Sequence, residues 1–193
     1  MGTRFANLGY ALLIVDSYGP RNIKQLCAEY SQTARLDRTL DAYGGLLYLA
    51  SLPFVDPERI AVVGYSQGAM VALSAVARGA FEGVFDHHFR AAVAYYPVCA
   101  GSSGSVSVPT LVLIGALDDW TPAQDCQDMM AKRSGEGAPL RLIVYPGAYH
   151  SFNAASLRDK PRTVLGHHLE YNEAADHAAW HETVEMLRQA FGH

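Results

Sequence analysis

A serine between a strand and a helix constrains this chain more than any other feature of its sequence. Gly64-Tyr65-Ser66-Gln67-Gly68 fits the pattern G-x-S-x-G. The predicted strand over residues 59–63 ends directly before it, and the predicted helix over residues 67–80, rich in Ala and Val, begins directly after Ser66. A nucleophile on so sharp a turn crowds its neighbours, so the residues two positions before and two positions after it must be small. The start of a helix also favours negative charge nearby. The pattern therefore predicts that Ser66 is a nucleophile and that the backbone N–H of Gln67 donates to a developing oxyanion.

The rest of the chain alternates short apolar runs with amphipathic stretches. This alternation predicts a mostly parallel sheet with helices on both faces, and therefore an α/β fold in a single domain over residues 1–193. In such sheets ligands bind at the carboxyl ends of the strands. We expect strands over residues 9–16, 59–63, 91–96, 110–114 and 140–145, helices over 34–52, 67–80, 122–133 and 173–191, and a long loop over 151–172.

Two further residues follow predicted strands and complete a triad. Asp118 comes shortly after residues 110–114, and His150 comes shortly after residues 140–145. A serine hydroxyl needs a base to act as a nucleophile, and the order Ser, Asp, His is typical of this strand–turn–helix motif. We therefore predict that His150 takes the Ser66 proton and that Asp118 orients the imidazole. Asp119 is the rival acid, although it is equally suited to cap the helix that begins at Pro122.

Aromatic residues flank the predicted triad, and their role stays open. Lining of an acyl pocket and packing in the core fit each of them equally well. They are Tyr95, Tyr96, Trp120, Tyr149 and Phe152.

Composition and spacing argue against several other functions. The chain has 15 basic and 19 acidic residues and a net charge of −4, whereas a nucleic-acid partner requires a basic surface. No apolar run approaches the length of a membrane span. The glycine-rich residues 101–105 lack the lysine of a phosphate-binding loop, and we expect no cofactor. His177 and His181 are four residues apart with no third ligand in evidence, so we expect no metal site.

The three cysteines are Cys27, Cys99 and Cys126, and an odd number leaves at least one without a partner in the chain. Three isolated thiols are the simpler interpretation. A disulfide between Cys99 and Cys126 is the alternative, because both follow strands that end near one another in the predicted sheet.

Six stretches together resemble the dienelactone hydrolase family of α/β-hydrolases. They appear in family order over about residues 4–190, and the resemblance implies an α/β-hydrolase fold with the triad Ser66, Asp118 and His150. The stretches are Asp16-Ser17-Tyr18-Gly19-Pro20-Arg21, Val55-Asp56-Pro57-Glu58-Arg59-Ile60, Gly64-Tyr65-Ser66-Gln67-Gly68, Tyr96-Pro97, Gly115-Ala116-Leu117-Asp118-Asp119-Trp120-Thr121-Pro122 and Tyr145-Pro146-Gly147-Ala148-Tyr149-His150-Ser151-Phe152.

The sequence departs from the family pattern in two respects. The enzymes that give the family its name use a cysteine nucleophile where this chain has Ser66. This difference favours a broader carboxylesterase activity over the hydrolysis of dienelactone. Family members also begin with more strands and with a His-Gly loop that supplies a second oxyanion donor. The missing third strand would lie between residues 9–16 and 59–63. We therefore expect an N-terminally truncated sheet, whose two strands either keep unpaired backbone groups or close up and pair with each other.

These observations favour a serine hydrolase that cleaves small-molecule carboxylic esters or lactones through an acyl-enzyme. Two other functions remain open. One is a catalytically impaired fragment or binding module that keeps the hydrolase fold. The other is acyl transfer or peptide cleavage by the same triad, because fold alone does not fix function.

Overall fold

The computed structural model describes residues 2–23, 38–81 and 83–192, and its centre is a parallel sheet. The sheet has the order β1-β2-β3-β4, and every neighbouring pair of strands is parallel. The register continues without a bulge from Ala61↔Ala91 to Gly115↔Tyr145. The strands are β1 (Ala61–Tyr65), β2 (Ala91–Tyr95), β3 (Thr110–Gly115) and β4 (Leu140–Tyr145).

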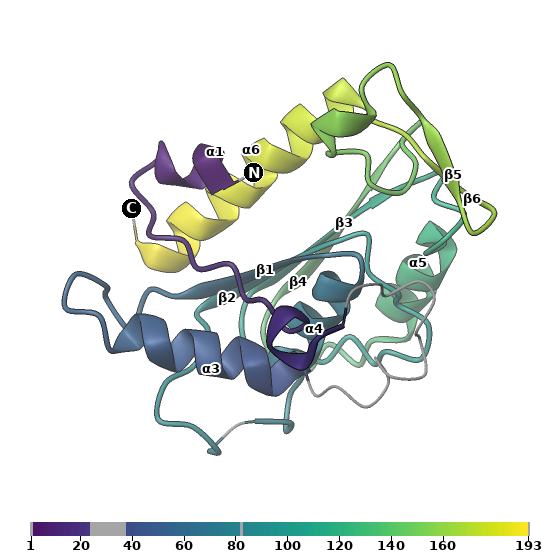
Figure 1. Cartoon of the computed structure of the whole chain (residues 1–193). Helices are drawn as coiled ribbons and strands as arrows, with labels where there is room; N and C mark the ends of the chain where they lie inside the picture. The colour runs from purple at the N-terminus through teal and green to yellow at the C-terminus, as the bar shows by residue number, and fades with distance from the viewer. Residues whose placement is uncertain (1, 24–37, 82, 193) are drawn as a thin grey trace.

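Helices cover both faces of this sheet, as Figure 1 shows. On one face α6 packs against β2 and β3, and α1 lies beside it. On the other face α4 packs on β1 and β2, α3 packs on α4, and α5 packs on β4. No helix in the described part of the chain is long and apolar enough to cross a bilayer. The helices are α1 (Gly2–Ala6), α3 (Arg38–Ala50), α4 (Gln67–Ala75), α5 (Ala123–Lys132) and α6 (Glu173–Phe191), with 3₁₀ turns η1 (Gly19–Arg21) and η2 (Ala155–Leu157).

The two inner strands form the core. Every residue of β2 and β3 is buried, as expected for parallel strands that have helices on both faces. On the α3 face, the Tyr43 ring stacks on Phe85 at a centroid distance of 4.4 Å, and its hydroxyl donates to the Ala75 carbonyl at 2.9 Å. The predicted α/β class and mostly parallel sheet are therefore confirmed.

The predicted buried strand over residues 9–16 is wrong. Residues 10–16 belong to no strand or helix, and Ile14 is 80% exposed. The apolar run indicates a need for burial, but burial as a strand also requires a neighbouring strand within hydrogen-bonding distance. Here a cavity separates residues 10–15 from β1. Residues 11–15 make no backbone hydrogen bond to another described residue, so the two runs do not pair directly with each other.

Other boundaries also differ from the predictions. Helix α4 ends at Ala75 instead of continuing to residue 80, because Ala77 forms a bridge with Val106. The first helical stretch is seen as α3, and residues 34–37 of the prediction, like Cys27, lie outside the described residues. The supposed loop 151–172 contains η2 and the antiparallel hairpin of β5 (Arg162–Val164) and β6 (His167–Leu169).

A disulfide joins Cys99, which follows β2, to Cys126 in α5. Both side chains are buried, and the two residues are 27 positions apart in the sequence. The alternative that the sequence left open is therefore the one that the structure contains. It ties the loop after β2 to the helix after β3, next to the carboxyl ends of both strands.

Removal of this disulfide will destabilise the fold. Closing a loop of this length stabilises a protein by about 3–4 kcal/mol, so we expect Cys99→Ala/Cys126→Ala to lower the Tm by roughly 10 °C. Thermal unfolding followed by circular dichroism measures the change. A reductant should lower the wild-type Tm by a similar amount and leave that of the double variant unchanged; an equal response of both proteins to the reductant would contradict the disulfide.

Candidate active site

The turn at Ser66 holds this residue in a strained conformation. Its φ is 52° and its ψ −117°, a region that non-glycine residues rarely occupy. The Ser66 N–H donates to the Tyr95 carbonyl at 2.9 Å and so extends the β1–β2 ladder by one bond. Helix α4 begins at the next residue, Gln67. The hydroxyl is therefore presented beyond the strand end, beside the N-terminus of α4.

Only one of the two glycines of the motif is required by close packing. A Cβ built on Gly64 would lie 2.0 Å from the Gly68 carbonyl oxygen, which no adjustment of a side chain can relieve. A Cβ on Gly68 would meet nothing within 4 Å. The sequence argument that both flanking positions must be small is therefore right for Gly64 and wrong for Gly68.

The structure brings Ser66, His150 and Asp118 into one hydrogen-bonded chain. His150 Nε2 lies 3.0 Å from Ser66 Oγ, and His150 Nδ1 lies 2.8 Å from Asp118 Oδ2. The imidazole and the carboxylate are buried. Because the carboxylate can only accept, Nδ1 carries the proton and Nε2 is left to accept from the serine hydroxyl.

Asp118 is held by three donors in addition to His150. Its Oδ1 accepts the N–H groups of Trp120 at 3.0 Å and Thr121 at 2.8 Å. The Thr121 hydroxyl lies 2.9 Å from Oδ2 and 3.2 Å from the Tyr96 carbonyl. A buried carboxylate is costly unless hydrogen bonds replace its hydration, and here four donors surround it. This arrangement fixes the side of the carboxylate that faces the imidazole.

Asp119 lies elsewhere. Its side chain is exposed and accepts the His168 N–H at 3.1 Å, so it holds strand β6. It does not cap α5, whose N-cap is Pro122. The structure thus places Asp118, and not Asp119, against the imidazole.

The aromatic residues divide into two groups. Tyr95 and Phe152 are fully buried core residues, and the Tyr95 hydroxyl lies 2.7 Å from Thr183 Oγ1. Tyr96 meets the His150 ring edge-on at 4.6 Å, and burial raises the pKa of its phenol, which stays neutral. Trp120 lies against His150 and lines the cavity beside Ser66.

The hairpin β5–β6 packs over the loop that carries Asp118. The His167 ring stacks on Trp120 at 4.9 Å, and the His168 ring meets Tyr149 at 4.3 Å. The long loop expected over residues 151–172 gave no sign of these contacts. The hairpin turn is Leu165-Gly166, with φ of 52° and 89°. Two-residue turns of this kind usually carry Asn or Asp first, so a leucine there gives no turn signal.

On the other side of Ser66, polar groups surround Gln67. Its side-chain oxygen accepts from Arg38 Nη1 at 2.9 Å and lies 3.4 Å from the Tyr18 hydroxyl. The Gln67 N–H makes no hydrogen bond with a described acceptor, so it is available to an oxyanion. In the described ranges, no group of three His, Cys, Asp or Glu side chains is placed to hold a metal ion.

Comparison with known proteins shows the family to which this chain belongs. The model of the family described as "Dienelactone hydrolase family" matches residues 1–191. The chain belongs to the dienelactone hydrolase family. A protein of Escherichia coli O157:H7 with the provisional name carboxymethylenebutenolidase is 24% identical over 149 residues. The match covers 71% of this chain and 48% of that protein, so the chain spans about half the length of this curated relative.

Two solved structures of the same kind show the fold. One is the dienelactone hydrolase-like promiscuous phosphotriesterase P91 from metagenomic libraries, with a TM-score of 0.73 and 22% identity over 97% of this chain and 77% of that one. The other is a provisionally named dienelactone hydrolase of Klebsiella pneumoniae subsp. pneumoniae MGH 78578, with a TM-score of 0.69 and 19% identity over 90% and 71%. The α/β-hydrolase fold expected from the sequence is therefore confirmed.

The two glycines of the turn offer a matched test. Gly64→Ala forces a Cβ into the α4 backbone, so we expect the free energy of unfolding to fall by more than about 3 kcal/mol. Gly68→Ala adds a helix-favouring residue in open space and should leave this free energy unchanged or raise it by up to about 1 kcal/mol. Urea unfolding measures both. Equal losses in the two variants would contradict the close approach.

Proposed function

We propose that this chain is a serine hydrolase that cleaves small-molecule carboxylic esters or lactones through an acyl-enzyme. The observation that carries the proposal is the continuous hydrogen-bonded chain from Asp118 through His150 to Ser66. Its three residues come from loops that follow β1, β3 and β4. The fold does not require these three side chains to meet, so a catalytic role is the simplest reason for their contact. Membership of the dienelactone hydrolase family supports hydrolytic chemistry.

The mechanism follows from the direction of these hydrogen bonds. Nε2 of His150 removes the proton of Ser66 as Oγ attacks the acyl carbon, and the carbonyl π electrons move to oxygen. Asp118 stabilises the imidazolium, and the Gln67 N–H donates to the oxyanion. His150 then protonates the leaving alkoxide as the acyl C–O bond breaks. Water, with His150 again as the base, cleaves the acyl-enzyme and restores Ser66.

The substrate class rests on the nucleophile and on the relatives. A hydroxyl nucleophile needs this base and an activated acyl group, and esters and lactones provide one. The names of the relatives refer to a lactone, to carboxymethylenebutenolide and to phosphotriesters. An ester or lactone is therefore the first substrate class to examine.

A second candidate is a protein that keeps the fold without catalysis. The observation that favours it is the cavity of approximately 1280 Å³ that includes Ser66 and Gln67 in its lining. Water in this space screens charge that develops on the oxyanion, whereas electrostatic stabilisation is strongest where water is excluded.

A fluorophosphonate probe tests the proposal directly. The wild-type protein should form a covalent adduct that maps to Ser66, because His150 is placed to activate this hydroxyl. Ser66→Ala should reduce labelling to background while its circular dichroism spectrum stays the same. Mass spectrometry of the labelled peptide identifies the site. A folded wild-type protein that remains unlabelled would support the second candidate.

The two neighbouring aspartates can be separated by the same assay. Asp118→Asn keeps the shape but loses the charge that orients His150, so we expect labelling to slow by about 10⁴-fold. Asp119→Asn changes an exposed group that contacts β6, so its labelling rate should stay near that of the wild type. If Asp119→Asn proved the slower of the two, the assignment of the acid would be wrong.

A further inference from the structure

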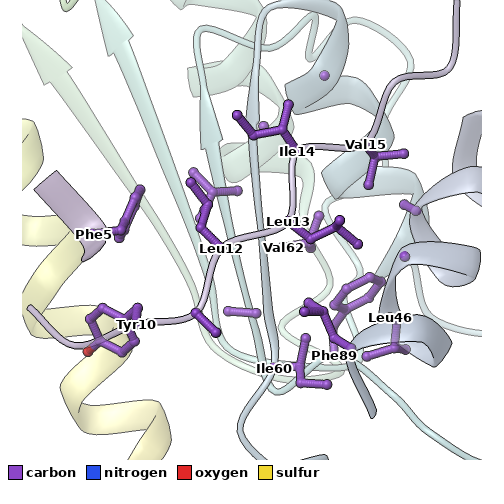
Figure 2. A pocket seen from close by; sticks show the side chains of 18 of the residues that line it. Phe5, Tyr10, Leu12, Leu13, Ile14, Val15, Leu46, Ile60, Val62 and Phe89 are labelled. Carbon is purple, nitrogen blue, oxygen red and sulfur yellow. The ribbon is translucent and has the colours of Figure 1, made fainter. Parts of the chain in front are cut away.

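Ser66 lies between an open side and a closed side. On the open side is the cavity between residues 10–15 and β1, and Figure 2 shows the apolar residues that line it. On the closed side, the side chains of His150 and Thr121 are buried. Water does not screen charge there, so the directions of the few protons on the closed side determine how readily His150 becomes positively charged.

Three polar groups surround the hydroxyl of Thr121. Its Oγ1 lies 2.9 Å from Asp118 Oδ2, 3.2 Å from the Tyr96 carbonyl oxygen and 3.3 Å from His150 Nδ1. The carboxylate and the carbonyl can only accept a hydrogen bond, whereas Nδ1 carries the proton that it donates to Asp118. Because a hydroxyl has one proton and two lone pairs, it donates to one acceptor at a time and can still accept from Nδ1–H.

The backbone at Tyr96 directs its carbonyl to this hydroxyl. Tyr96 has a φ of 43°, and its N–H donates to the Leu113 carbonyl at 2.7 Å. Among the described hydrogen bonds its carbonyl accepts from Thr121 alone. The disulfide between Cys99 and Cys126 ties the segment after Tyr96 to α5, which begins two residues after Thr121. The surrounding structure therefore holds a strained residue so that its carbonyl stays within reach of the hydroxyl.

The charge on His150 decides which acceptor the hydroxyl prefers. While the imidazole is neutral, the carboxylate of Asp118 is the stronger acceptor, because a hydrogen bond to an ionised group is about twice as strong as one between neutral groups. The Thr121 proton then points to Asp118, and the carbonyl of Tyr96 is left without it.

The preference changes once His150 carries a second proton. The imidazolium neutralises the carboxylate, and both Nδ1–H and the hydroxyl proton then point to the same oxygen, Asp118 Oδ2. If the hydroxyl turns, its proton goes to the Tyr96 carbonyl, a buried acceptor that is costly to leave without a donor. The same turn directs a lone pair of Thr121 Oγ1 to Nδ1–H of the cation.

We infer that Thr121 is a positioning residue of the triad. Its hydroxyl turns from Asp118 to the Tyr96 carbonyl as His150 takes the proton of Ser66, and it turns back when His150 gives that proton to the leaving group. No proton leaves Thr121 in either step, since only the direction of its O–H bond changes. The inference rests on the proposed hydrolase function, because the attack of Ser66 is the step that forms the imidazolium.

Removal of the hydroxyl has an effect whose sign separates this role from a static one. A hydroxyl that always donates to Asp118 draws charge from the carboxylate and weakens its attraction for the imidazolium. Its loss would make His150 easier to protonate. A hydroxyl that turns accepts a hydrogen bond from the imidazolium, so its loss makes His150 harder to protonate.

Besides the other two members of the triad, few titratable groups face the imidazole in the described part of the chain. The Tyr96 phenol meets it edge-on and stays neutral, because burial raises its pKa. From the hairpin β5–β6, His167 stacks on Trp120, which lies against His150. Asp119 Oδ1 lies 3.7 Å from His167 Nδ1. These groups stay the same when only the hydroxyl is removed.

Thr121→Val removes the hydroxyl and keeps the branched shape of the side chain. We expect the plateau rate of fluorophosphonate labelling to fall about tenfold, the usual effect of one hydrogen bond to a charged group. The pH midpoint of labelling, above which His150 is neutral and acts as the base, should move to lower pH by up to about one unit. Thr121→Ser keeps the hydroxyl and should stay near the wild type in both respects.

Thr183→Val is the matched control. The buried Thr183 hydroxyl lies 2.7 Å from that of Tyr95, so this variant also loses a buried hydrogen bond, but outside the triad. It should lower the Tm about as much as Thr121→Val and leave the labelling rate and its pH midpoint unchanged. The same change of midpoint in both variants would assign the effect to a general loosening of the fold and overturn the inference.

NMR spectroscopy tests the turn of the hydroxyl without any reaction. As the pH falls through the midpoint of the His150 ring signals, the carbonyl carbon signal of wild-type Tyr96 should move downfield, because this carbonyl gains the hydroxyl proton. In Thr121→Val the midpoint should lie at lower pH. A wild-type Tyr96 signal that does not move, or a midpoint that stays or rises in Thr121→Val, would overturn the inference.

The two proposals can fail separately. A folded wild-type protein that the probe never labels would contradict the hydrolase, whereas the NMR signals of His150 and Tyr96 would still report whether the Thr121 hydroxyl turns. Normal labelling of Ser66 with a pH midpoint that Thr121→Val does not lower would leave the hydrolase intact and overturn the role of Thr121.

Discussion

The hydrogen-bond ladder of the parallel sheet determines where every candidate active-site residue lies. It continues one step beyond each strand, from Ser66 N–H to the Tyr95 carbonyl, from Tyr96 N–H to the Leu113 carbonyl and from Ala116 N–H to the Tyr145 carbonyl. Since the strands are parallel and in register, these last bonds lie along one edge of the sheet. The loops that leave this edge carry the nucleophile, the acid and the base. A shift in the register of one strand would separate Ser66 from His150.

Backbone strain gathers at the same edge. Ser66, Tyr96 and Ser151 all have positive φ, although none is a glycine. Each follows a strand or a site residue and is held by bonds to the sheet or to buried neighbours, as Ser66 is by the Tyr95 carbonyl. Strained residues persist only where the surrounding structure over-determines them. The buried strands β2 and β3 provide that support. They hold the strained turn at Ser66 in place although their own side chains take no part in the chemistry.

The sequence predicted the structure correctly where a segment's conformation depends mainly on its own residues. It predicted β4 and α6 at their observed bounds, and it predicted the approach of His150 to Ser66 because strand ends share an edge. It predicted Asp118 as the acid but could not exclude Asp119, since the difference between them arises from Thr121 and from the hairpin, which are contacts formed only on folding. It predicted a buried strand over residues 9–16, because an apolar run does not report whether a neighbouring strand is present. The hairpin escaped notice because Leu165 occupies a turn position that usually takes Asn or Asp.

The edge of β1 that no described strand covers affects the behaviour of this protein in concentrated solution. A strand edge near exposed Leu12, Ile14 and Val15 is a template on which another chain can add a strand. Natural sheets protect such edges with charges, prolines or covering loops, and the run from Tyr10 to Val15 contains no charge and no proline. The protein is therefore prone to intermolecular β-pairing, and its solubility should decline with concentration more steeply than that of a protein whose sheet edges are covered.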